Sequence, residues 1–130
     1  FIGISSAPQF LEKLMWKKFS KKIKKIIMIK KIYHFEHGGF VYPITKQLIF
    51  DAKKNKVLNN KINLEIPIFL FHSTNDKVVP LSFSKKILKI CRKSIKKLIK
   101  IKNGDHSLSR KSDLKKICNE LNYMIKNYIN

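Results

Sequence analysis

The chain has 130 residues, of which 44% are hydrophobic, and 29 basic residues against 8 acidic ones give a formal net charge of +21. This length fits one small domain, and this hydrophobic content excludes a disordered tail. Lysine interrupts every apolar run before it reaches the length of a membrane-spanning helix, about 18 residues, so we expect no transmembrane segment.

The positive charge is a weak guide to function. Arg92 and Arg110 are the only arginines, and the lysines are spread along the whole chain. Because nucleic-acid sites favour arginine for bidentate contacts with bases and phosphates, we expect no specific nucleic-acid partner. One alternative stays open, in which the lysine-rich residues 10–32 act as a basic module that binds an anionic membrane or a nucleic acid.

Cysteine and histidine spacing indicates no metal site. Cys91 and Cys118 lack the paired spacing of a zinc site or a disulfide framework, so we expect buried, reduced thiols in an intracellular, cytoplasmic protein. His34 and His37 have no carboxylate or cysteine pattern beside them. We expect neither a metal nor any other cofactor.

The first half of the chain predicts a short strand and then helices. Residues 1–4 are apolar, residues 5–8 form a turn, and apolar residues then recur at spacings of three and four with lysines between them, as one long helix or two broken near Ser20. We expect a loop from His34 to Gly39, and a helix that Thr45 caps and that ends near Asn55. Residues 10–56 are therefore expected to form a helical, lid-like insertion. Its apolar residues Met15, Trp16, Phe19 and Tyr42 are candidates either to line an acyl pocket or simply to pack the helices.

The second half predicts alternating strands and helices. Residues 68–71 contain no polar side chain, as in a strand covered on both faces, and a helix follows from Leu81 or Ser82. A strand around residues 98–101 and a final helix opened by Ser112 and Asp113 complete the chain. The final helix is expected to bury Leu114, Ile117, Cys118, Leu121, Ile125 and Tyr128.

This order predicts an α/β fold with about three parallel strands, flanking helices and a helical insertion. In such a small parallel sheet, one edge strand with apolar faces would have backbone N–H and C=O groups without a pairing strand. We therefore expect a partial domain over residues 1–130, with residues 66–130 as its C-terminal strands and helices, and the missing N-terminal half as its partner.

Two polar turns follow the last two strands. The turn after residues 66–71 contains Asp76, and the turn after residues 98–101 contains His106, so both side chains are expected at the same rim of the sheet. An acid followed by a histidine is the second half of a Ser…Asp…His relay. Taken singly, Asp76 could be a turn-forming residue and His106 a surface histidine. No Gly-x-Ser-x-Gly nucleophile motif is present, so we expect the serine to lie upstream of Phe1.

Three other residues compete for roles in this relay. Ser5, in the degenerate string Gly3–Ala7, would complete the order within this chain, but Ala replaces the final glycine. Asp105 is an alternative acid, although a residue adjacent to His106 normally points away from its ring. His72 is expected to pack at the end of its strand.

The two turns together resemble the α/β-hydrolase superfamily. Residues 72–80, His-Ser-Thr-Asn-Asp-Lys-Val-Val-Pro, resemble its His-Gly-x-x-Asp-x-x-Val-Pro pattern, with Ser73 where the family usually has glycine. Residues 103–109 resemble its histidine turn. More narrowly, residues 3–10, 14–16, 42–45 and 104–109 resemble the branch with the mitochondrial palmitoyl-protein thioesterase and acyl-glucuronide esterase and its bacterial relatives, which makes a mitochondrial location the alternative.

The resemblance implies a serine hydrolase that cleaves a small-molecule or acyl-protein ester or thioester through an acyl-enzyme. Asp76 would be the triad acid and His106 the general base and acid. It would cover only the C-terminal half of such an enzyme, so the isolated chain is predicted to be inactive. An inactive, truncated gene product remains a third hypothesis.

Overall fold

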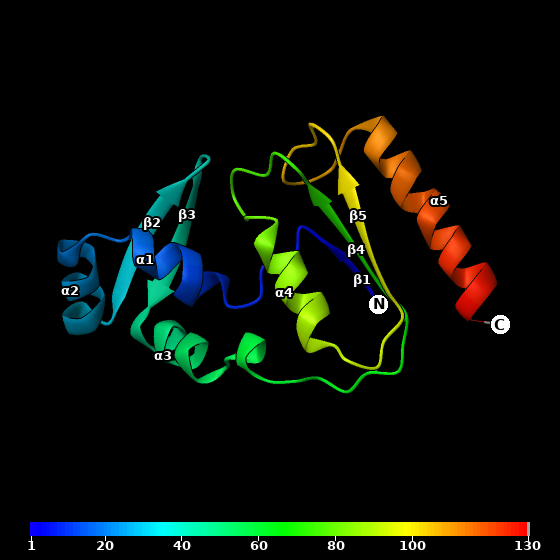
Figure 1. The fold of residues 1–130 in the computed structure, drawn as a ribbon. Coiled ribbons are helices and arrows are strands. Elements are labelled where there is room, and N and C mark those ends of the chain that lie inside the picture. Colours follow the sequence, from blue (N-terminus) through cyan, green and yellow to red (C-terminus); the bar gives the residue numbers. More distant parts are fainter. Residues whose placement is uncertain (130) are drawn as a thin grey trace. The chain divides into compact units, whose positions relative to one another are not determined.

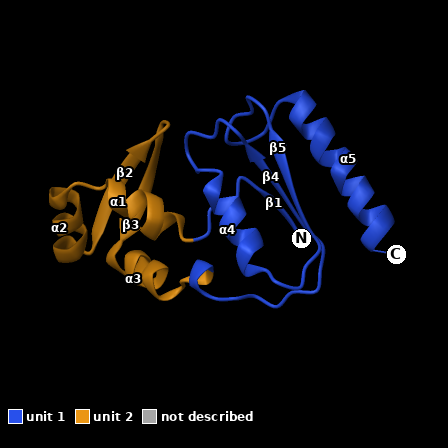
Figure 2. Ribbon diagram, in the orientation of Figure 1, with its two compact units in different colours: residues 1–8, 58–130 blue, residues 9–57 orange. Residues whose placement is uncertain are grey.

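The computed structural model describes residues 1–129, and it divides the chain into two compact units (Figure 2). Unit 1 consists of residues 1–8 together with the C-terminal part from Leu58, and unit 2 consists of residues 9–57. A short 3-10 helix, Val57–Asn59, spans the second boundary between them.

Unit 1 is built on a three-stranded parallel sheet (Figure 1). Its strands are β1 (Ile2–Ile4), β4 (Ile68–Ser73) and β5 (Lys96–Ile101), in the order β1-β4-β5. The central strand β4 is buried at every position, as predicted for its apolar residues 68–71, and the polar His72 and Ser73 at its end are buried as well. The expected α/β architecture with three parallel strands is confirmed.

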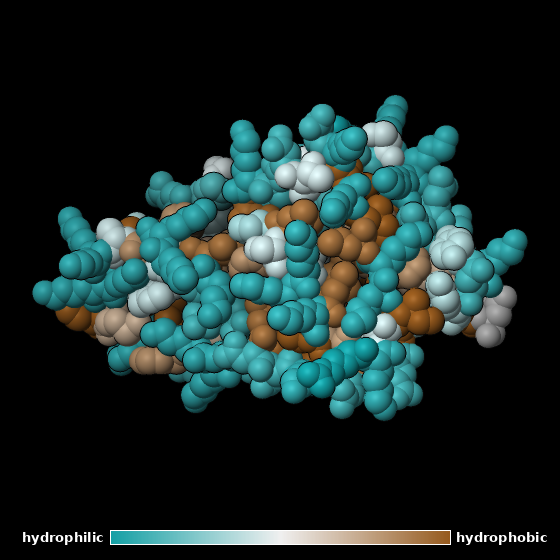
Figure 3. Space-filling view, viewed as in Figure 1, coloured by the Kyte–Doolittle hydropathy of each residue, from teal (hydrophilic) through white to brown (hydrophobic). Residues whose placement is uncertain are grey.

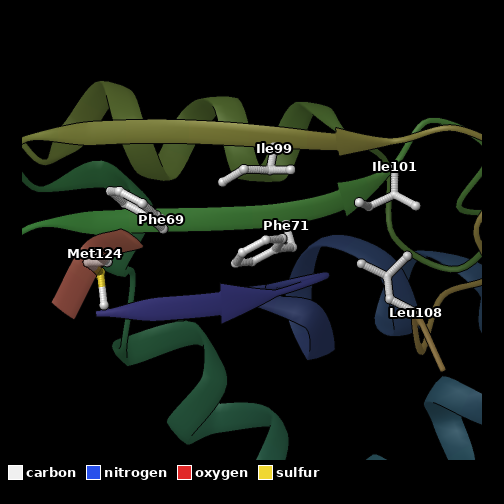
Figure 4. Packing of buried hydrophobic residues seen from close by; sticks show 6 residues of the cluster. All are labelled: Phe69, Phe71, Ile99, Ile101, Leu108 and Met124. Carbon is white, nitrogen blue, oxygen red and sulfur yellow. The ribbon is translucent and has the colours of Figure 1, made fainter. Parts of the chain in front are cut away.

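Helices cover both faces of this sheet. Because successive side chains of a strand point to opposite sides, each face has its own apolar cluster, which packs against a helix. On one face, Phe69 and Phe71 pack with Ile99, Ile101, Leu108 and Met124, the last from α5 (Lys111–Tyr128) (Figure 4). On the other face, Ile68 and Leu70 form a cluster with Cys91, which ends α4 (Ser82–Ile90). The strand ends are thereby fixed between two helical layers.

The buried face of α5 differs from the one predicted. Leu114 is 49% exposed, Ile125 is 44% exposed and Cys118 is exposed, whereas Met124 is 4% exposed. The residues that contact the sheet cluster are Ile117, Leu121, Met124 and Tyr128. Their spacing of four, three and four follows one narrow stripe, and residues one position further on lie about 100° around the helix. The expectation of a buried thiol is therefore wrong for Cys118 and right for Cys91.

Unit 2 begins with helical segments and contains a β-hairpin that was not predicted. A π-helical turn (Leu11–Met15) leads into α1 (Trp16–Lys18), and α2 (Lys21–Lys30) follows. Strands β2 (Ile32–His37) and β3 (Phe40–Thr45) then pair antiparallel. The prediction of a loop from His34 to Gly39 is wrong, because only Gly38 and Gly39, both at positive φ, form the turn.

The α3 helix (Lys46–Lys54) of unit 2 begins where the sequence predicted, and of the two alternatives for the preceding segment the structure has the break near Ser20. The Ser20 hydroxyl accepts a hydrogen bond from the Ile23 N–H at 3.2 Å at the start of α2, and Thr45 accepts one from the Leu48 N–H at 3.0 Å at the start of α3.

Unit 2 has a core of its own. Phe19, Ile27, Ile44 and Ile49 are buried together, and Met15 and Trp16 pack against this cluster. The Phe19 ring makes edge-on contacts with the rings of Trp16, Tyr33 and Phe35. Met15, Trp16 and Phe19 thus serve as packing residues of unit 2, whereas Tyr42 is 45% exposed.

Hydrophilic side chains are distributed over both units on the face shown in Figure 3, with hydrophobic atoms between them. This distribution agrees with a sequence in which lysine recurs along the whole chain. Among residues 1–129, no helix is long and apolar enough to cross a membrane.

Candidate acid–base site at the strand ends

The parallel pairing of β4 and β5 brings the two polar turns together. The last register pair joins Ser73 to Ile101, and the Thr74 N–H donates to the Ile101 carbonyl at 2.9 Å. The turn that carries Asp76 and the loop that carries His106 therefore start side by side.

Asp76 and His106 are hydrogen-bonded to each other. Nδ1 of His106 lies 2.8 Å from Oδ2 of Asp76. The other carboxylate oxygen, Oδ1, accepts from the backbone N–H groups of Val78 and Val79, each at 2.8 Å. The Asp76 side chain is 1% exposed and that of His106 is 39% exposed, so the imidazole is the accessible member of the pair.

The hydrogen bonds keep the carboxyl group of Asp76 ionised. Burial raises the pKa of Asp76, but the hydrogen bonds from His106, Val79 and Val78 together outweigh it, and the pKa lies below its ordinary value. Since an ionised carboxylate can only accept, Nδ1 of His106 carries the proton. Nε2 is then the ring nitrogen with a free lone pair, as a general base requires.

A second, fully buried histidine supports the acid turn. His72 Nε2 lies 2.9 Å from the carbonyl oxygen of Val79, and Nδ1 lies 2.7 Å from the Ser84 hydroxyl. A carbonyl can only accept, so Nε2 donates and Nδ1 accepts from Ser84. The same Nε2 is 3.5 Å from Oδ2 of Asp76. His72 therefore packs at the strand end, as expected, and also holds the segment that contains Asp76.

The competing residues have other hydrogen-bond partners. Asp105 belongs to the same loop as His106, and its carboxylate accepts a hydrogen bond from the Ser109 hydroxyl at 3.2 Å. Ser5, at a positive φ of 46°, donates its hydroxyl to the backbone carbonyl of His106 at 2.6 Å rather than to the imidazole. The hydroxyl of Ser5 thus contacts the backbone of the candidate base and not its imidazole ring.

Ser73 is a site residue whose role sequence analysis missed. Its hydroxyl donates to the Gly104 carbonyl at 2.6 Å and accepts from the Asn75 N–H at 3.0 Å. It therefore connects the acid turn to the histidine loop. The only signal in the sequence is that a serine stands where the hydrolase pattern has glycine.

Among residues 1–129, no group of three or more His, Cys, Asp or Glu side chains could hold a metal ion. His34 and His37 lie instead on the exposed strand β2.

The family of the chain follows from a comparison with family models. The model of the phospholipase/carboxylesterase family matches residues 48–125, which is more than half of the chain and includes both Asp76 and His106. The chain belongs to this family. No curated protein matches it.

Solved hydrolase structures share the fold of this family member. A putative hydrolase from Agrobacterium vitis S4 is 21% identical, with a TM-score of 0.86 over 95% of this chain and 48% of its own. The alpha/beta hydrolase domain-containing protein 10 from mouse is 22% identical, with a TM-score of 0.79 over 96% of this chain and 51% of its own. The esterase domain of a Rhodothermus marinus protein, also 22% identical, has a TM-score of 0.58 over 75% of this chain and 40% of its own. This phospholipase/carboxylesterase family member thus spans about half the length of the hydrolases it resembles, and its α/β-hydrolase fold is confirmed.

Proposed function

We propose that this chain supplies the acid and the base of a serine hydrolase that cleaves an ester or a thioester. The hydrogen bond of 2.8 Å between Asp76 and His106 carries the proposal. The nucleophilic serine belongs to residues upstream of Phe1.

The geometry supports a specific division of labour. Nε2 of His106 takes the proton of the serine hydroxyl as its oxygen attacks the substrate carbonyl, and a tetrahedral intermediate forms. The resulting imidazolium keeps its Nδ1–H bonded to Asp76, whose negative charge stabilises it. The imidazolium then gives its proton to the leaving alcohol or thiol, which yields the acyl-enzyme. In the second half of the reaction, His106 takes a proton from a water molecule, whose oxygen attacks the acyl-enzyme. The imidazolium then returns the proton to the serine, and the carboxylic acid is released.

The sheet order supports an upstream position of the nucleophile. Strand β1 pairs with β4 on one side, and among residues 1–129 no strand pairs with its other edge. A further parallel strand at this edge would present its carboxyl end at the same rim as Asp76 and His106. The chain also spans about half of the solved hydrolases that resemble it, which is consistent with a catalytic serine outside it.

Unit 2 is proposed to be the lid-like insertion of this enzyme. It leaves the sheet after residues 1–8 and returns at residue 58, so it is inserted between two strands of unit 1. Its own core lets it fold as an insertion without contributing to the sheet.

A fluorophosphonate probe tests the proposal, because it labels only an activated serine. The chain is compared with a form extended by the coding sequence that continues in frame before Phe1. We expect labelling of the extended form, its loss in His106→Gln, and no labelling of the chain alone. Labelling of the chain alone that Ser5→Ala abolishes would identify Ser5 as the nucleophile and overturn the proposal.

The finer substrate class is proposed from the resemblance of residues 3–10 and 104–109 to the thioesterase and acyl-glucuronide esterase branch. The extended form is assayed with a long-chain acyl thioester, an acyl glucuronide and a short p-nitrophenyl ester. A higher kcat/KM for either of the first two supports this branch, and preference for the short ester contradicts it.

A further inference from the structure

We infer that Ser5 and Ser73 form a hydroxyl clamp, which holds the loop of His106 in the position that its hydrogen bond to Asp76 requires. Both serines are then positioning residues of the site. The inference rests on the proposed function only for the consequence that it draws for turnover.

The clamp has two anchor points on neighbouring strands. Ser5 follows β1 and donates to the His106 carbonyl at 2.6 Å, and Ser73 ends β4 and donates to the Gly104 carbonyl at 2.6 Å. Both distances are at the short end of the range for O–H···O hydrogen bonds. Because the two carbonyls lie two residues apart, the bonds restrain both the position and the tilt of the segment 104–106.

Burial makes these bonds hard to replace, above all that of Ser73. Ser5 is 6% exposed and Ser73 is 1% exposed; the Ser73–Gly104 bond is buried and the Ser5–His106 bond is partly buried, so water substitutes for the Ser73 hydroxyl less readily than for that of Ser5. A buried carbonyl that loses its donor pays the desolvation of a polar group, and the loop gains by moving toward solvent. Such a movement carries the backbone of His106 away from Asp76.

Ser73 acts on both members of the pair. Its oxygen accepts from the Asn75 N–H at 3.0 Å, in the turn that leads to Asp76, while its proton goes to Gly104 in the loop that leads to His106. One side chain thus sets the distance between the two turns. A residue without a hydroxyl at this position could do neither.

The expected consequence is a change in the tautomer of His106. In the intact site the carboxylate of Asp76 holds the proton on Nδ1, which leaves Nε2 free. A loop that has moved lengthens the Nδ1···Oδ2 distance and lets the proton occupy either nitrogen. The fraction of Nδ1–H form therefore measures the clamp directly, whether or not the protein turns over a substrate.

The chain offers a matched control in Ser94. This residue is 8% exposed, and its hydroxyl donates to the Leu64 carbonyl at 2.7 Å, so the bond has the same chemistry as both clamp bonds and is partly buried like that of Ser5. It precedes β5, whereas the His106 loop follows β5, and the strand separates the two by about 20 Å. Loss of this hydroxyl should affect stability alone.

The experiment measures imidazole ¹⁵N chemical shifts in histidine-labelled protein, expressed with any coding sequence that continues in frame before Phe1. The His106 signals are assigned from His106→Gln. We expect mainly the Nδ1–H form in the unmodified protein and a mixture of both tautomers in Ser5→Ala and Ser73→Ala. Ser94→Ala should retain the unmodified spectrum with a comparable fall in melting temperature. Retention of the Nδ1–H form in Ser5→Ala and Ser73→Ala overturns the inference.

A second measurement needs no variant. Three-bond couplings about the Cα–Cβ bond should report one rotamer for Ser5 and for Ser73, and averaged couplings overturn the clamp. In an ester assay we expect kcat to fall roughly 10- to 100-fold in the two clamp variants, with KM little changed. If the tautomers respond but no form hydrolyses esters, the proposed function fails and the clamp stands. If the protein hydrolyses esters but the tautomers do not change in the two clamp variants, the clamp is wrong and the proposed function stands.

Discussion

Nδ1 of His106 lies 2.8 Å from Oδ2 of Asp76, although 30 residues separate them in the chain. Two backbone N–H groups hold the other oxygen of Asp76, so the carboxylate cannot turn away from the ring. The buried member of the pair is therefore fixed, and the exposed imidazole is the member that can meet a substrate.

Replacement of His106 by glutamine is expected to abolish ester hydrolysis by the extended protein, with a loss of about 10⁴-fold or more in kcat, because no other group takes the serine proton. Its ring is 39% exposed, so the melting temperature should stay close to that of the unmodified protein. His34→Gln, an exposed histidine of β2, is the matched control and should retain full activity. Activity that persists in His106→Gln contradicts its role as base.

Asp76→Asn should lower kcat by about 10⁴-fold, because a neutral amide neither fixes the tautomer of His106 nor stabilises the imidazolium. Steady-state kinetics with a p-nitrophenyl ester measure this loss. Asp105→Asn changes the neighbouring carboxylate, which accepts from Ser109 instead, and should have little effect. Equal losses in the two variants would mean that Asp76 is not the specific partner.

Stability should fall in acid through Asp76. The pKa of its carboxyl group in the folded chain lies below the ordinary value of 3.8, so the folded state favours the ionised form. This contribution is present above pH 3.8 and is lost as the pH falls through the lower folded value. Urea unfolding is measured between pH 2 and pH 6, in about one-unit steps. The acid slope, the fall in the free energy of unfolding as the pH decreases, should be shallower in Asp76→Asn than in the unmodified protein.

Part of the acid slope should survive in Asp76→Asn. The Arg110 guanidinium, which bonds both oxygens of Asp113, lowers the pKa of that carboxyl as well. Asp113→Asn should therefore remove a further part of the slope. An acid slope that Asp76→Asn leaves unchanged would contradict the first assignment.

His72→Phe should destabilise the protein by about 2–4 kcal/mol, since it leaves the Val79 carbonyl and the buried Ser84 hydroxyl without their partner. The change in urea midpoint measures the loss. His37→Phe, on the exposed part of β2, has the same chemistry without burial and should change the midpoint little. Equal midpoints for the two variants would argue against a structural role of the His72 network.

Gly104→Ala should shift the histidine loop. A Cβ atom at this position would meet Cδ2 of Leu108 at 2.6 Å and Cγ2 of Ile101 at 3.1 Å, and both neighbours are buried. Overpacking of this kind costs about 1–3 kcal/mol, and relief by loop movement should also lower kcat. Lys102→Ala, at an exposed position of the same loop, is the control for both measurements. Unchanged stability and kcat would show that the loop has room for a methyl group.

Much of the sheet could be predicted because local pattern and final environment agree. Residues 68–71 are uniformly apolar, and the strand they form is covered on both faces. Thr45 predicted the start of α3 because a capping hydroxyl needs only the next turn of the helix. In both cases the deciding interactions lie within a few residues.

The hairpin of unit 2 was missed although its signal was present. Gly38 and Gly39 form the two-residue turn expected between paired strands, and residues 32–37 alternate between exposed and half-buried positions over most of their length. The lysine-rich helical pattern before them favoured a helix followed by a loop. Pairing with β3 decided the outcome, because each strand gains its hydrogen bonds only from the other.

The sequence by itself determined the order of strands and helices in unit 1, the acid and the histidine after successive strands, and the absence of a nucleophile motif between Phe1 and Asn130. Only the tertiary structure decided which atoms meet: Nδ1 of His106 with Asp76, and the hydroxyls of Ser5 and Ser73 with the backbone of the histidine loop. The reason is that the pattern of a strand or helix depends on residues that are neighbours in the chain. The hydrogen bonds of the site join residues 30 positions apart (Asp76 and His106) and 101 positions apart (Ser5 and His106), so they depend on how the sheet aligns the ends of its strands.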